Sequence, residues 1–171
     1  MKKSYVYLLT TFMLWGSLYV VSQFVLGKIP TFTVAMFRYL IAFIALSLIS
    51  LKSEKEKIEK SDYKYFFIMG FIGYFISVDC QLLGTKIAGG SMASLINSLN
   101  PVIISVMAMI ILNEKSEMNK IVGIVLSLAG VYMIIGTGAN IQFLGVLISF
   151  IAVIGWAFMS VISRKISNKY S

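Results

Sequence analysis

The sequence predicts an all-α membrane protein with six transmembrane helices, and three observations support this. First, 58% of the 171 residues are hydrophobic and 13% are charged, whereas a soluble domain averages about 45–50% apolar and about 25% charged residues. Second, apolar runs of about 18 or more residues, long enough to cross a bilayer as a helix, recur along the whole chain. Third, these runs lack the strict alternation of a membrane β-strand.

Helices are expected because every backbone polar group in lipid needs a partner within the protein. The first apolar run follows Met1, Lys2 and Lys3, as in a signal peptide. It lacks a small-residue cleavage site and is followed by further apolar runs, so it is interpreted as a retained helix. The six predicted spans are Tyr5–Leu26, Thr33–Leu51, Lys64–Leu83, Ser91–Leu112, Asn119–Ile135 and Phe143–Ser163.

The basic residues predict the orientation. If the N-terminus is inside, every lysine and arginine lies on the cytoplasmic side except Lys28, Lys86 and Arg38. This asymmetry follows the positive-inside rule and predicts that both termini are cytoplasmic. It also explains the net charge of +8 without a nucleic-acid partner. The expected location is the cell membrane, and the Lys- and Ile-rich usage suggests a bacterial origin.

The composition argues against an enzyme. The chain has no histidine and one cysteine, Cys80, which leaves no His-based catalysis and no multi-cysteine metal site. It also lacks a phosphate-binding P-loop and a nucleophile-elbow motif. We therefore expect no catalytic residue, no metal and no cofactor.

Several motifs follow one another in a characteristic order. They are "LWGSLYV" in the first span, "FRYLIA" in the second, "GGSMASLINSLNPVIISVMAMIILNEK" in the fourth and "IVGIVLSLAGVYMI" in the fifth. This order resembles the EamA-type family of the drug/metabolite transporter superfamily. The resemblance implies a five-helix repeat at 1–136. It also implies the first helix of an incomplete second repeat at 137–171, where Trp156 and Ala157 correspond to Trp15 and Gly16.

Members of that family typically have ten helices, arranged as two five-helix repeats of opposite topology. The six spans therefore represent the first half of such a transporter, and a homodimer or a partner chain is expected to supply the missing helices. The resemblance implies movement of a small organic metabolite or drug across the membrane by alternating access. Two alternatives stay open: a truncated fragment that does not transport, and a membrane interaction or accessory protein.

The fourth span contains the first candidate site. Pro101 has no N–H, so the carbonyl of Asn97 loses its helical donor and a hinge is expected. Asn97 and Asn100 are three residues apart and lie on one helix face. They are expected to bind substrate in a central pocket. The alternative is that both amides bond to neighbouring helices and only stabilise packing.

Three aromatic residues extend this candidate pocket. Trp15 and Trp156 lie near the middle of their spans, although membrane tryptophans prefer the interfaces. With Tyr19 one turn beyond Trp15, they are expected to wall a substrate pocket. The alternative is ordinary interior packing. Small residues at Gly70, Gly73 and Ser77, and at Gly123, Ser127 and Gly130, predict close helix contacts.

Charges inside spans are rare and are normally paired or face a cavity. Arg38 and Asp79 lie at similar depths below the outer surface, which favours an ion pair over a site for a charged or zwitterionic substrate. Otherwise each side chain reaches outward, or Asp79 pairs with Lys86. Glu114 ends the fourth span, where the helix dipole disfavours an anion, so a cationic partner and a gating or coupling role are expected.

Overall fold

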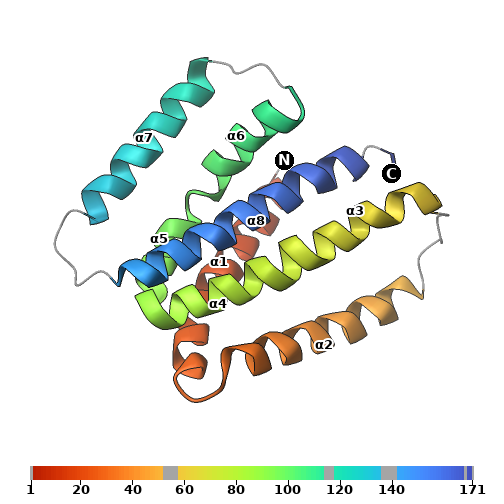
Figure 1. Cartoon of the computed structure of the whole chain (residues 1–171), viewed down its shortest axis with the longest axis horizontal. Helices are drawn as coiled ribbons and strands as arrows, with labels where there is room; N and C mark the ends of the chain where they lie inside the picture. Colours follow the sequence, from red (N-terminus) through yellow and green to blue (C-terminus); the bar gives the residue numbers. More distant parts are fainter. Residues whose placement is uncertain (1, 52–57, 114–117, 136–141, 168, 171) are drawn as a thin grey trace.

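The computed structural model describes residues 2–51, 58–113, 118–135, 142–167 and 169–170, and every regular element in these ranges is helical (Figure 1). The prediction of an all-α membrane protein is therefore confirmed. The elements are α1 (Lys2–Leu26), α2 (Thr31–Ser50), the 3-10 turn η1 (Lys60–Asp62), α3 (Tyr63–Ile68), the π-helix η2 (Met69–Ile76), α4 (Ser77–Ala88), α5 (Gly90–Asn97), α6 (Asn100–Ile111), α7 (Met118–Ile135) and α8 (Phe143–Ser167).

Five helical stretches among the described residues are long and apolar enough to cross a membrane. They are Tyr5–Leu26, Thr31–Ser50, Lys60–Ala88, Gly90–Ile111 and Phe143–Ser167. The fifth predicted span, Asn119–Ile135, corresponds to α7, whose apolar part, Met118–Met133, is shorter. The third stretch has 29 residues and extends beyond the predicted Lys64–Leu83 at both ends, where its polar residues suggested loops.

An unexpected feature of the third stretch is the π-helix η2. π-Helical turns are rare, and they often occur at functional sites. Here the hydroxyl of Tyr39 on α2 donates a hydrogen bond to the main-chain carbonyl of Tyr74 in η2. This bond attaches α2 to the third stretch. Nothing in the apolar sequence "MGFIGYFI" distinguishes a π-helix from an α-helix.

Helix α8 lies at the centre of the bundle and runs antiparallel to η2 and α4 (Figure 1). In its most apolar window 56% of the residues are buried, against 6% for α2. Small residues allow this approach: a Cβ added to Gly145 would lie 2.6 Å from the backbone nitrogen of Ala88. The Ser77 hydroxyl donates a hydrogen bond to the Ala152 carbonyl across the same contact.

The close contacts predicted for the small residues form in the third stretch but not in α7. Gly73 and Ser77 contact α8, so the predicted close packing is confirmed at these two positions. At Gly70 an added Cβ would meet no described atom within 4 Å, so the prediction is wrong there. In α7 a Cβ added to Gly123 or Gly130 would meet no atom within 4 Å among the described residues. Figure 1 shows α7 at the edge of the bundle. The small-residue face of α7 therefore does not serve packing within the described chain.

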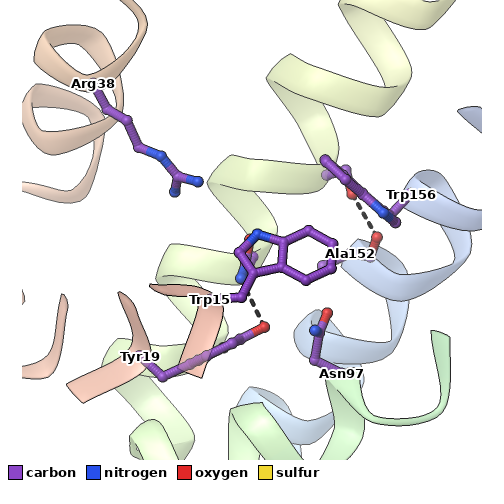
Figure 2. A pocket seen from close by; sticks show the side chains of 8 residues that line it. Trp15, Tyr19, Arg38, Asn97, Ala152 and Trp156 are labelled. Atoms are coloured by element: carbon purple, nitrogen blue, oxygen red, sulfur yellow. Dashed lines mark hydrogen bonds between the residues drawn. The ribbon is translucent and has the colours of Figure 1, made fainter. Parts of the chain in front are cut away.

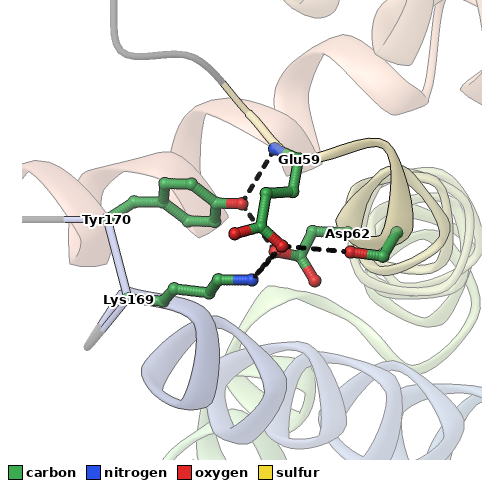
Figure 3. Close-up of polar contacts among 5 residues, drawn as sticks. Glu59, Asp62, Lys169 and Tyr170 are labelled. Atoms are coloured by element: carbon green, nitrogen blue, oxygen red, sulfur yellow. Dashed lines mark hydrogen bonds and ion pairs between the residues drawn. The ribbon is translucent and has the colours of Figure 1, made fainter.

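A polar cluster joins the residue pair after α8 to the start of the third stretch (Figure 3). The Lys169 ammonium group lies 2.7 Å from both Glu59 Oε2 and Asp62 Oδ2. The Tyr170 hydroxyl donates to Asp62 and accepts a hydrogen bond from the Glu59 N–H. Hydrogen bonding to Asp62 and Glu59 raises the pKa of Lys169, and the bond to Asp62 raises the pKa of Tyr170.

This cluster places the end of α8 beside the start of α3. Helix α1 runs from Trp15, whose ring meets that of Trp156, to Gln23, whose side chain accepts a hydrogen bond from the Gly90 N–H just after α4. Helices α1 and α8 therefore start at opposite ends, as an inverted repeat requires. The cytoplasmic location of this end stays a prediction.

A glycine pair tests the packing of α8. Gly145→Ala should destabilise the protein by about 1–3 kcal/mol, because the added methyl group forces α8 away from α4. Gly123→Ala on α7 is the matched control and should leave stability unchanged or slightly raised, since its added methyl group meets no neighbour. Thermal unfolding in detergent measures both, and equal melting temperatures would contradict the packing described for α8.

Candidate functional site

The candidate solute groove lies where α1, α5, α6 and α8 meet. Its volume of about 440 Å³ falls within the range of about 300–1,000 Å³ typical of small-molecule sites. Trp15 and Trp156 lie on opposite helices that line it, and Asn97, Asn100 and Pro101 come from the interrupted fourth span. The lining residues are Phe12, Trp15, Gly16, Tyr19, Ser94, Asn97, Ser98, Asn100, Pro101, Ile104 and Trp156.

A narrow recess adjoins this groove and shares four of its residues: Trp15, Tyr19, Asn97 and Trp156. Its volume of about 20 Å³ is enough for about one water molecule. The recess is completed by Arg38, Ser77, Gln81 and Ala152. In Figure 2, Arg38 reaches from one side and Asn97 from the other toward the space around Trp15.

The aromatic residues form a continuous wall. The rings of Trp15 and Trp156 meet edge to face, with centroids 5.9 Å apart. The ring of Tyr74 also meets that of Trp156 edge to face, with centroids 6.0 Å apart. The structure thus brings together the two tryptophans that were expected to share a pocket, and it adds Tyr74. Their role in binding substrate stays a prediction.

Gln81 is a site residue that the sequence pattern did not reveal. Its side-chain amide donates a 2.7 Å hydrogen bond to the hydroxyl of Tyr19, which is buried. This bond fixes the ring of Tyr19 against the third stretch. An amide inside an apolar span is itself a signal, because such groups usually find a partner on another helix.

The fourth span is interrupted, as its proline and asparagines suggested. Helix α5 ends at Asn97 and α6 begins at Asn100, with the break at Ser98 and Leu99. Pro101 lies in the first turn of α6, where its missing N–H costs no helical hydrogen bond. The break therefore falls just before the proline. A hinge movement at this position stays a prediction.

The two asparagine side chains bond to each other. The Asn100 amide donates to Asn97 Oδ1 at 2.6 Å. Asn100 Oδ1 is buried and has no hydrogen-bond partner among the described residues. Among the described residues, neither side chain bonds a helix of another span, and a buried acceptor without a donor is costly. The binding of substrate by Asn97 and Asn100 stays a prediction.

The ion pair expected between Arg38 and Asp79 is not formed. Arg38 Nη1 and Asp79 Oδ1 are both buried without a hydrogen-bond partner in the described part of the chain. Arg38 opens into the recess, whereas Asp79 lines a separate apolar crevice beside Tyr39 and Phe75. Among the described residues, Asp79 also makes no ion pair with Lys86. Glu114, the third charge of interest, lies outside the described residues.

Comparison with known proteins supports the class that the fold suggests, a multi-pass membrane protein of a transporter family. Residues 2–136 match the model of the EamA-like transporter family. The chain belongs to this family. The division of the chain at residue 136 into two repeats stays a prediction. No solved structure matches the chain.

Curated relatives are also named as transporters. The "Uncharacterized transporter YetK" of Bacillus subtilis is 28% identical over 98% of this chain and 53% of its own length. An "Uncharacterized transporter" of Clostridium kluyveri is 27% identical over 96% of this chain and 57% of its own length. The chain therefore spans little more than half the length of these relatives.

A methionine pair tests the charge state of the recess. Arg38→Met should leave the melting temperature unchanged or raise it, because a half-buried cation with an unsatisfied Nη1 atom is replaced by an apolar side chain of similar length. Gln81→Met should lower stability by about 0.6 kcal/mol, since Tyr19 loses its interhelical hydrogen bond. Thermal unfolding in one detergent compares the two, and a lower melting temperature for Arg38→Met would mean that Arg38 is paired.

Proposed function

We propose that this chain forms part of a transporter that moves a small organic metabolite or drug across the cell membrane, with the groove as its binding site. One observation carries the proposal. A groove of about 440 Å³ is walled by two tryptophans and contains the interrupted helix with its paired asparagines. Family membership supplies the class of activity.

The interrupted helix favours solute binding. Backbone that is not helical at membrane depth is tolerated where it is buried in protein or lines a wet cavity. Such broken helices commonly form the substrate sites of transporters near the bilayer centre. The unsatisfied carbonyl of Asn100 supplies an acceptor at this break. The tryptophans supply apolar surface for the body of the solute.

The groove needs a further wall to become an enclosed site. Buried residues make up 11% of the most apolar window of α1 and 6% of that of α2. The small-residue face of α7 is also uncovered within the described chain. We propose that a second copy or a separate chain covers part of this surface and completes the pathway. Alternating access would then move the two halves against each other.

A chain that inserts but does not transport is the second candidate. The relatives are nearly twice as long as this chain. The two candidates differ in whether the groove binds a solute at all. Binding by the chain favours the transporter, and its absence favours the non-transporting chain.

The asparagine pair gives the test. Asn97→Leu combined with Asn100→Leu should leave membrane insertion and helix content intact while the affinity for solutes falls at least about tenfold, because the polar groups of the break are lost. Asn119→Leu on α7 is the control and should bind normally. A metabolite screen by thermal shift finds the solutes, and titration then compares the variants. Unchanged binding by the double variant would refute the groove as the site.

A further inference from the structure

The side chain of Arg38 is half-buried, and its guanidinium group lines the recess. Its Nη1 atom has no hydrogen-bond partner among the described residues. A buried cation is costly unless an opposite charge or several hydrogen-bond acceptors surround it. The cost is reduced when an anion enters beside it. Arg38 therefore favours an anionic group over a neutral or cationic group in the recess.

Within the described part of the chain, no acidic side chain lines the recess beside Arg38. Among α1, α2, α5, α6, α8 and the apolar part of the third stretch, Asp79 is the one acidic residue of the described sequence. Asp79 lines the crevice between α2 and the third stretch instead. The remaining recess residues are neutral, so the lining carries a single positive charge.

We propose that the groove recognises a small organic anion, with a carboxylate in the recess beside Arg38 and an apolar body against Trp15 and Trp156. This inference rests on the proposed function and names the substrate class of the same site. The recess of about 20 Å³ has room for about one water-sized group, so one carboxylate oxygen would lie inside it and the other at its mouth. The adjoining groove of about 440 Å³ has room for the rest.

The polar groups around the recess suit a carboxylate. A guanidinium group presents its N–H donors as a planar fork that matches the two oxygens of a carboxylate. Tyr19 adds a further donor, because its hydroxyl accepts the Gln81 amide hydrogen and keeps its own proton for another acceptor. A neutral amide would use fewer of these donors, and a cation would be repelled by Arg38.

The two tryptophans make the test possible without a label. Trp15 and Trp156 are the only tryptophans in the sequence, and both line the recess and the groove. Quenching of their fluorescence therefore reports occupancy directly. The probes are 3-phenylpropionate, 3-phenylpropionamide and 3-phenylpropylamine, which share one carbon skeleton and differ in charge. Hexanoate, hexanamide and hexylamine repeat the comparison with an aliphatic body, using the whole chain in lipid nanodiscs.

The expected result is that the carboxylate of at least one series binds at least about tenfold more tightly than its amide, and that the amine binds most weakly. Arg38→Gln should abolish this preference while the affinity for the amide changes less than about threefold. Arg38→Lys keeps the charge and should restore part of the preference. Asp79→Asn is the matched control and should keep it, because Asp79 does not face the recess.

Three results would overturn the inference. Equal affinities for carboxylate and amide would refute recognition of an anion, while the groove would remain a solute site. Loss of the preference in Asp79→Asn as well as in Arg38→Gln would mean that the two residues act as an ion pair. No quenching by any of the six probes would count against the anion site and against the proposed function together.

Discussion

The close antiparallel contact of α8 with η2 and α4 is the constraint on which the rest of this structure depends. In lipid, helices gain little from apolar burial alone, and association relies on close packing and interhelical hydrogen bonds. Small residues provide that packing at Gly145, Gly155 and Ser77. The bond from Ser77 to the Ala152 carbonyl fixes the register, and the polar cluster around Lys169 fixes one end of the helix pair.

The register of α8 determines where the candidate site lies. With Ala152 held against Ser77, Trp156 falls one turn further along and meets Trp15 of α1. The same helices bring Gln81 to Tyr19 and leave a groove beside the interrupted fourth span. Arg38 enters from α2 and supplies the single charge of the recess. The docking of α8 thus helps to assemble a site that combines one charge, two indoles and three amides.

The sequence predicted much of this arrangement because its signals are local. Span length and composition predicted the helices, and Pro101 with its neighbouring asparagines predicted the break in the fourth span. Contacts between distant residues were harder to predict. The hydrogen bond between Gln81 and Tyr19 depends on how α4 and α1 are rotated about their own axes. The separation of Arg38 from Asp79 depends in the same way on the rotation of α2 and α4. Equal depth in the membrane suggested a pair, but depth does not determine rotation.

The most direct measurement is a disulfide test of the α8 contact. A Cβ added to Gly155 lies 3.3 Å from the Cβ of Ser77, close to the spacing of about 3.5–4.5 Å found in disulfides. Ser77→Cys with Gly155→Cys, in a Cys80→Ser background, should oxidise in the membrane to a cross-link within one chain. Non-reducing electrophoresis and peptide mass analysis would show a monomer that contains the linked peptides. Two free thiols after oxidation, or a cross-link only between two chains, would contradict the docking of α8 described here.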